Sequence, residues 1–210
     1  MRGKFLILTF MLMACTTFGQ ASFERFYQEA NVFFSTYVSN NGVNYAALQE
    51  QPQALNSLYS QLSQLKPSLE NAANYQAFYI NAYNLAVIHT VVEHYPIKSP
   101  MAVSGFFERI KHPIAGEEIT LNTLENKRLR ANFNEARFHF VLVCGAISCP
   151  PIVNFAYVPT QLNVQLERQA TKALNNPNFI RVKPDEKRVE LSEIFKWYKE
   201  DFVTKNQNEI

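Results

Sequence analysis

The stretch from Asn74 to His94 reads NYQAFYINAYNLAVIHTVVEH, and it decides the fold. Its apolar residues recur at helical spacing, but they are spread around much of the helix circumference instead of forming one stripe. A helix that is apolar on most sides has to be covered on most sides. The pattern therefore predicts a central, largely buried helix around which the rest of the chain packs.

Shorter segments on both sides of this helix have simpler periodicities. Where apolar residues recur every three or four positions, we predict amphipathic helices. These predicted helices span residues 22–38, 54–65, 123–132, 160–174 and 193–202. Two hairpins are predicted from alternating runs joined by turn residues, one over 109–121 with Ala115-Gly116 at its turn and one joining 179–182 to 188–191.

The stretch from Arg137 to Pro151 reads RFHFVLVCGAISCPP. Residues 138–143 are apolar at all but one position, which predicts a strand that is covered on both faces. A turn that contains Cys144 and Cys149 follows it. Together these elements predict one α+β domain over residues 20–210, with several amphipathic helices around a small mixed sheet and 138–143 as its buried central strand.

Residues 1–19 have the anatomy of an export signal. Arg2 and Lys4 precede an apolar run that is shorter than the ~20 residues of a membrane-spanning helix. Small residues before Gln20 place the cleavage there. The mature protein is therefore expected in the periplasm or outside the cell, without a transmembrane span. The residues that end at Cys15 also resemble a lipoprotein box, so an anchor through a lipidated Cys15 is the alternative.

The charge of the mature chain bears on its partners. Residues 1–19 hold two of the 20 Lys and Arg residues and no acid, which leaves 18 basic and 18 acidic side chains. A chain without net positive charge does not attract nucleic acid. The expected partner is therefore an unknown small molecule or protein, and not nucleic acid.

No cofactor or metal is expected. The chain has no phosphate-binding glycine loop and no dinucleotide-binding fingerprint. The spacing of His139, Cys144 and Cys149 matches no standard zinc pattern.

Four ordered segments resemble the domain-of-unknown-function family numbered 547, DUF547. They are QAFYINAYN at residues 76–84, TLNTLE at 120–125, the RFHFVLVCG to proline stretch at 137–151, and LSEIFKWY at 191–198. The family pattern usually has Trp where Tyr79 stands, and Ile-Glu-His where this chain has Leu124-Glu125-Asn126. The second difference removes a histidine that would otherwise be a candidate for chemistry. The resemblance implies membership and carries no settled activity.

Cys144 has two interpretations. As a nucleophile it needs a nearby base. His139 belongs to the same motif, but residues five apart in a regular strand point to opposite faces and lie roughly 16 Å apart, so the base would have to come from elsewhere in the fold. As a structural residue, Cys144 would form a disulfide with Cys149, which an oxidising compartment favours.

Other polar residues also have two interpretations. Asn81 and Asn84 lie on one face of the buried helix, where they either bind the backbone of the Cys144–Pro151 turn or line a polar pocket. Glu125 is either an acid or base near the thiol, or the second half of a capping box that begins at Asn122. Candidate binding residues are Asn81, Asn84, Glu125, His139 and Ser148.

Two functions stay open at this point. The first is a ligand-binding or interaction module whose site is the Cys144–Pro151 turn with the facing Asn81/Asn84 helix. The second is a thiol-dependent hydrolase or acyl transferase with Cys144 as the nucleophile. The sequence does not decide whether the protein is an enzyme.

Overall fold

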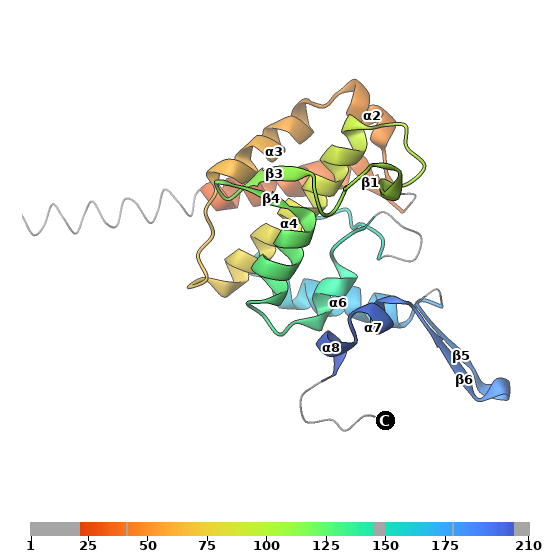
Figure 1. Ribbon diagram of the computed structural model, residues 1–210. Coiled ribbons are helices and arrows are strands. Elements are labelled where there is room, and N and C mark those ends of the chain that lie inside the picture. Colours follow the sequence, from red (N-terminus) through yellow and green to blue (C-terminus); the bar gives the residue numbers. More distant parts are fainter. Residues whose placement is uncertain (1–21, 41, 145–149, 178, 204–210) are drawn as a thin grey trace, which may run out of the picture.

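A computed structural model describes residues 22–40, 42–144, 150–177 and 179–203 (Figure 1). An N-terminal helix over residues 22–37 precedes the labelled elements. The α-helices are α2 (Tyr45–Glu50), α3 (Gln53–Gln64), α4 (Ala72–Glu93), α5 (Leu121–Thr123), α6 (Leu162–Leu174), α7 (Ile194–Trp197) and α8 (Lys199–Phe202). There are also short 3-10 helices, η1 (Pro100–Ala102), η3 (Ala136–Phe140) and η4 (Pro184–Glu186), and a π-helix, η2 (Leu124–Arg130).

Strands occur only as short antiparallel pairs in the described part. They are β1 (Val38–Ser39) with β2 (Gly42–Val43), β3 (Lys111–Ile114) with β4 (Glu117–Thr120), and β5 (Ile180–Lys183) with β6 (Arg188–Leu191). The α+β class is as predicted. The three pairs are separate, so the described residues contain no central mixed sheet.

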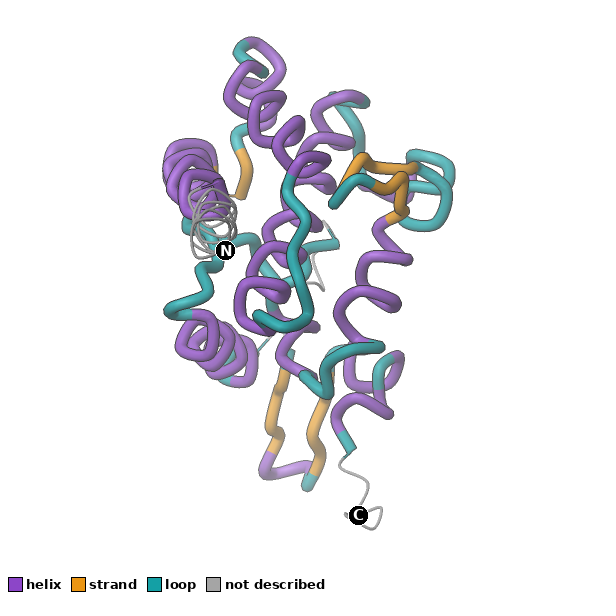
Figure 2. Tube along the Cα trace, turned by 90° about the vertical axis from the view of Figure 1, so that its left-hand side faces the viewer, coloured by secondary structure: helices purple, strands orange, loops and turns teal. Residues whose placement is uncertain are grey.

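The long helix α4 is the centre of the molecule, as its apolar circumference predicted (Figure 2). It packs against α2, α3, α5 and η2. Nearly all of its residues from Tyr75 to Val91 are buried, including two asparagines. The Asn71 side chain caps its first turn by accepting a hydrogen bond from the backbone of Asn74 at 3.1 Å. No helix in the described ranges combines the length and the apolar character that crossing a bilayer requires.

The N-terminal helix covers one side of α4 with aromatic side chains. Phe26, Phe33 and Phe34 are almost completely buried. The rings of Phe26 and Phe78 lie 5.7 Å apart between their centroids, and Phe23 meets Phe78 edge-on at 5.8 Å. The predicted amphipathic helix is thus confirmed, and its buried face joins the main core.

The hairpin predicted at Ala115-Gly116 is confirmed. Ile114 pairs with Glu117, and both turn residues have positive φ, 56° at Ala115 and 80° at Gly116. Positive φ at both central positions is the conformation that fits the twist of two-residue hairpins. The backbone N–H of Ala115 also donates to the carbonyl of Leu62 at 2.7 Å, which ties the turn to α3.

The strand predicted over residues 138–143 is wrong. Residues up to Phe140 form the 3-10 helix η3, and Val141 and Leu142 follow in a turn. The predicted burial is correct, since residues 138–142 are all buried. A short apolar run has no feature that distinguishes a strand from another buried segment. Here the backbone beyond η3 is hydrogen-bonded by a side chain of α4 instead of by a neighbouring strand.

The C-terminal part forms a second, smaller core. Phe140, Phe179 and Ile194 are buried together with α6 residues, and Phe195 and Phe202 pack against them. The hairpin β5–β6, confirmed as predicted, projects from this part of the molecule (Figure 1). The helix predicted over 193–202 is divided at Tyr198 into α7 and α8.

Candidate functional site

Asn84 on α4 holds the backbone just before the Cys144–Pro151 turn. Its Nδ2 donates to the carbonyl of Val141 at 3.0 Å, and its Oδ1 accepts from the N–H of Val143 at 3.1 Å. The side chain is buried and uses both its donor and its acceptor on backbone. Of the two interpretations of Asn84, the structure thus has the one in which its amide binds and positions the backbone.

Asn81, one helical turn earlier, holds the backbone after the same turn. Its Nδ2 donates to the carbonyl of Tyr157 at 2.7 Å and its Oδ1 accepts from the N–H of Tyr157 at 3.0 Å. Nδ2 also donates to the carbonyl of Ala77 at 2.8 Å. Because Asn81 and Asn84 lie three positions apart, they bind the chain before and after the turn from the same side of α4.

The chain after the turn has two further anchors. Gln165 of α6 accepts from the N–H of Val158 and donates to the carbonyl of Ala156, both at 2.9 Å. Asn31 of the N-terminal helix accepts from the N–H of Ala156 at 3.2 Å. Side chains of three helices therefore fix the backbone of residues 156–158.

The predicted helix 123–132 begins with the short α5 and continues as the π-helix η2. An i to i+5 hydrogen bond joins the N–H of Ala131 to the carbonyl of Asn126 at 3.1 Å. π-helices are rare and are found frequently at functional sites. The wider turn puts Glu125 and Arg130, five residues apart, beside the same C-terminal residues. The π-helix was missed by the sequence prediction, because no residue pattern marks it.

Hydrogen bonds, ring contacts and electrostatic interactions join five residues into one group, which we name the polar cluster: Glu125, Arg130, His139, Tyr198 and Asp201. Arg130 Nε donates to Asp201 Oδ2 at 2.6 Å, and His139 Nε2 lies 2.6 Å from the same oxygen. The Arg130 guanidinium lies 4.9 Å from the centre of the Tyr198 ring. The Tyr198 hydroxyl and the Glu125 carboxyl interact, and each shifts the pKa of the other.

The pKa values of the two carboxyl groups in the polar cluster are shifted in opposite directions. Burial raises the pKa of Glu125, and the bond from Tyr198 and the charge of Arg130 only partly oppose this. Burial alone would also raise the pKa of Asp201, but the bonds from Arg130 and His139 outweigh it and hold that pKa below its ordinary value. The cluster thus keeps Asp201 ionised and makes Glu125 the carboxyl that protonates more readily.

His139 is held inside the protein by two kinds of contact. Its ring stacks on Tyr198 with centroids 3.9 Å apart, and its Nε2 faces Asp201. Burial lowers the pKa of His139 despite the neighbouring carboxylate of Asp201. Since η3 and a turn replace the predicted strand, the separation of His139 from Cys144 that strand geometry implies does not apply.

The capping box predicted for Asn122 and Glu125 is wrong. Thr120 caps the helix instead, with its Oγ1 accepting from the N–H of Thr123 at 3.1 Å. The Asn122 side chain accepts from Asn126 Nδ2 at 2.7 Å. Glu125 is therefore available to the polar cluster.

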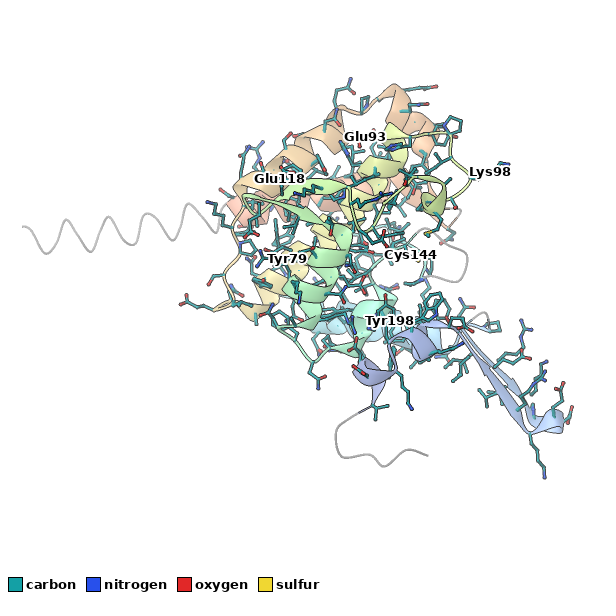
Figure 3. All side chains as sticks on the ribbon, viewed as in Figure 1. Tyr79, Glu93, Lys98, Glu118, Cys144 and Tyr198 are labelled. Carbon is teal, nitrogen blue, oxygen red and sulfur yellow. The ribbon has the colours of Figure 1, made fainter. Side chains whose placement is uncertain are left out.

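Cys144 is half-buried and takes part in an interaction. In the view of Figure 3, Cys144 is labelled above Tyr198, which lies between α7 and α8. Ser148 and Cys149 lie outside the described residues. The disulfide and the binding role of Ser148 remain predictions.

Three members of the polar cluster were absent from the sequence-based candidates. Arg130, Tyr198 and Asp201 are not among the candidates that the sequence patterns indicate. Tyr198 ends the fourth segment of the family resemblance, which was a usable signal. Asp201 follows three residues later with no such signal.

The fold defines the class as a helix-rich α+β domain built on one central helix. The family model described as "Protein of unknown function, DUF547" matches residues 67–173. This is half of the chain, so the chain belongs to the DUF547 family. The match includes α4, η2 and η3, whereas Tyr198 and Asp201 lie after it. The searches of curated proteins and of solved structures each found no match.

Proposed function

We propose that this chain is the precursor of an exported module that binds a small molecule at the polar cluster. The leader-like residues 1–19 support export. The observation that carries the binding site is the Glu125 carboxyl, which the π-helix holds half-buried against the hydroxyl of Tyr198. Perturbed carboxyl groups with specific partners are concentrated at functional sites.

The charges of the polar cluster favour a zwitterionic ligand, such as an amino acid or a dipeptide. Among the described residues, the hydrogen bonds of Arg130 use Nε on Asp201 and Nη1 on Asn126, which leaves the Nη2 donors to bind a carboxylate of the ligand. Glu125 offers an acceptor for an ammonium group. A guanidinium and a carboxyl that belong to one helix, five residues apart, match the two charged ends of such a molecule.

The clamp formed by Asn81 and Asn84 supports the same proposal. The backbone of Val141 and Val143, which follows η3 with His139, is hydrogen-bonded to Asn84, and the backbone of Tyr157 is hydrogen-bonded to Asn81. A site whose backbone is ordered before binding loses less conformational entropy when the ligand arrives. Asn81 and Asn84 would thus contribute to binding by positioning the chain.

Calorimetric titration of the mature protein with the common amino acids and glycylglycine tests this proposal. Glu125→Gln and Arg130→Lys are expected to weaken the binding at least tenfold, because the first removes the carboxylate charge and the second the Nη2 donors, and a charge-assisted hydrogen bond is worth about 1.5–3 kcal/mol. Lys127→Ala is the matched control, since Lys127 is exposed on the same π-helix. The proposal fails if none of these probes binds, or if Glu125→Gln binds them as the wild type does.

A thiol-dependent hydrolase or acyl transferase with Cys144 as the nucleophile is the second candidate. One observation favours it: His139 faces the Asp201 carboxylate, which is the arrangement of a catalytic base and the group that orients it. Alkylation of the mature protein with iodoacetamide across pH distinguishes the two candidates. Half-maximal alkylation of Cys144 well below the ordinary thiol pKa of about 8.5 would support the enzyme, and a bonded or ordinary cysteine would exclude it.

A further inference from the structure

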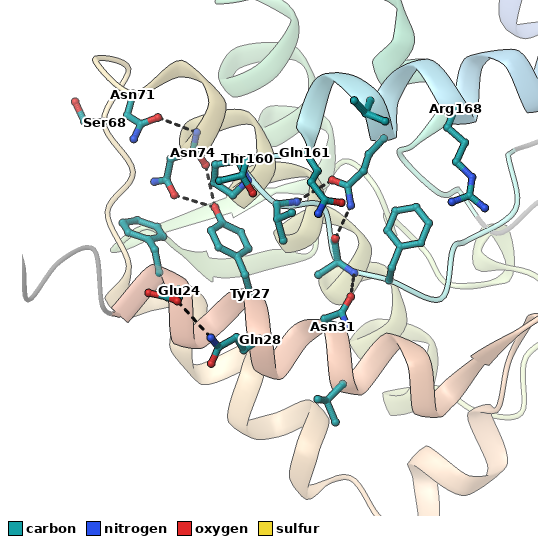
Figure 4. A pocket seen from close by; sticks show the side chains of 18 of the residues that line it. Glu24, Tyr27, Gln28, Asn31, Ser68, Asn71, Asn74, Thr160, Gln161 and Arg168 are labelled. Atoms are coloured by element: carbon teal, nitrogen blue, oxygen red, sulfur yellow. Dashed lines mark hydrogen bonds between the residues drawn. The ribbon is translucent and has the colours of Figure 1, made fainter.

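A groove of about 1340 Å³ lies between the N-terminal helix, the start of α4 and the start of α6 (Figure 4). Phe23, Tyr27 and Asn31 line it from the N-terminal helix, where their spacing of four puts them on one face. Phe155 and Gln161 line the opposite wall. The volume exceeds the roughly 300–1,000 Å³ of sites for single drug-sized ligands, so it suits an extended molecule of several units.

The frame of the groove is rigid. The Tyr27 hydroxyl donates to the carbonyl and to Oδ1 of Asn74, at 3.1 and 3.0 Å, which joins the N-terminal helix to α4. Across the groove, Asn31 and Gln165 hold the backbone of Ala156. The walls are therefore bonded to each other at both ends before any ligand binds.

Several side-chain amides at the groove have N–H donors that make no hydrogen bond to the described residues. Asn31 and Asn74 use only Oδ1 in side-chain hydrogen bonds within the described part, which leaves the donors on Nδ2. The side chain of Gln161 makes no hydrogen bond to the described residues, although it lines the groove. Each of these groups offers two N–H donors, and Gln161 offers an acceptor as well.

The charges around the groove do not fit an ionic ligand. Glu24, Lys66 and Arg168 come from three different segments. Glu24 accepts a hydrogen bond from Gln28 at 3.4 Å on its own helix. Two cations on separate walls do not form the converging set that a phosphate or a polyanion requires.

We infer that this groove binds a neutral, hydroxyl-rich chain, an oligosaccharide, through the amides of Asn31, Asn74 and Gln161. Sugar hydroxyls both donate and accept hydrogen bonds, as side-chain amides do. The half-buried rings of Phe23 and Phe155 provide apolar surface for the C–H faces of sugar rings. An extended peptide is a poorer match, because helices and loops line the groove and no strand edge does.

Titrations of the mature protein with cellotetraose, chitotetraose, maltotetraose and xylotetraose, followed by amide NMR shifts, test this inference. Tetra-alanine is the peptide probe. Two variants remove donors: Gln161→Ala, and Asn31→Asp, which keeps the oxygen that binds the backbone of Ala156. Gln53→Ala is the matched control, since Gln53 is exposed on α3 and does not line the groove. Thermal unfolding of each variant checks that the fold is retained.

At least one tetrasaccharide is expected to bind saturably, with affinity reduced at least fivefold by Gln161→Ala and by Asn31→Asp and unchanged by Gln53→Ala. The inference is overturned if no sugar binds at up to about 10 mM, if both variants bind as the wild type does, or if only tetra-alanine binds. These results are independent of the polar cluster, so either proposal can fail without the other.

Discussion

The side chain of Asn81 binds both backbone polar groups of Tyr157, 76 residues away. It donates to the Tyr157 carbonyl at 2.7 Å and accepts from the Tyr157 N–H at 3.0 Å. Both residues are almost completely buried. The central helix thereby substitutes for a neighbouring strand, because it satisfies backbone groups of a segment without secondary structure.

Replacing Asn81 with Leu tests this relationship. The substitution leaves the N–H and the carbonyl of Tyr157 buried without partners, at about 1–3 kcal/mol for each group. We expect the free energy of unfolding, measured with urea, to fall by about 3 kcal/mol.

Asn163→Leu is the matched control, because Asn163 is exposed on α6. Its stability is expected within about 0.5 kcal/mol of the wild type. Equal effects of the two substitutions would show that the Asn81 bonds do not hold the segment.

His112 forms a second buried polar contact, away from the polar cluster. Its Nδ1 lies 2.8 Å from the Tyr59 hydroxyl, and the Tyr59 ring stacks on His89 at 3.8 Å. His112 Nε2 has no hydrogen-bond partner among the described residues. Burial, with a smaller contribution from His89, lowers the pKa of His112 to about 4.

This shift predicts a loss of stability in acid. Between the ordinary histidine pKa of 6.5 and the folded value of about 4, the unfolded chain binds a proton that folded His112 does not. Stability therefore falls as pH falls through this window, by roughly 3 kcal/mol in total at about 1.36 kcal/mol per pKa unit.

His112→Asn keeps an acceptor near the Tyr59 hydroxyl and removes the titration. Urea unfolding between pH 6.5 and 5 should show a shallower pH dependence for this variant than for the wild type, by roughly 2 kcal/mol over the interval. Identical slopes would mean that His112 takes up its proton equally in both states.

The turn residue Ala115 is a site where stability can be gained. Its φ of 56° is unfavourable for a residue with a Cβ atom, whereas glycine adopts it readily. Ala115→Gly is expected to raise the free energy of unfolding by up to about 1 kcal/mol.

Ala54→Gly makes the same chemical change on the exposed face of α3, and there it should destabilise by about 0.5–1 kcal/mol. Thermal unfolding of the two variants should therefore shift in opposite directions. A destabilised Ala115→Gly would contradict the turn geometry.

Sequence patterns predicted the elements whose signal is local and repeated. The apolar circumference from Asn74 to His94 predicted α4 to within two residues, and Ala115-Gly116 predicted the β3–β4 turn. The strand predicted over residues 138–143 is wrong, because a buried apolar segment does not form a strand when no partner strand is adjacent. The buried amides at Asn81 and Asn84 did predict bonding to the flanks of the turn.

The polar cluster was beyond sequence reasoning for a different reason. It depends on the i to i+5 hydrogen bonding of η2 and on contacts between residues far apart in the sequence: Asp201 lies 71 residues from Arg130 and 62 residues from His139. Glu125 was a candidate with two interpretations, an acid or base near the thiol or a capping residue, and the capping interpretation placed its partner within its own helix. Tertiary structure, with Tyr198 approaching from the C-terminal helices, overrides that local preference.

We propose that this protein acts by binding, outside the cytoplasm, and that Cys144 and Cys149 are structural. The intact mass of the exported protein, measured without reduction, tests this claim most directly. We predict a chain that begins at Gln20 and is two hydrogens lighter than its reduced form, as a Cys144–Cys149 disulfide requires. A mature chain with both thiols free would contradict the account and return Cys144 to the position of a candidate nucleophile.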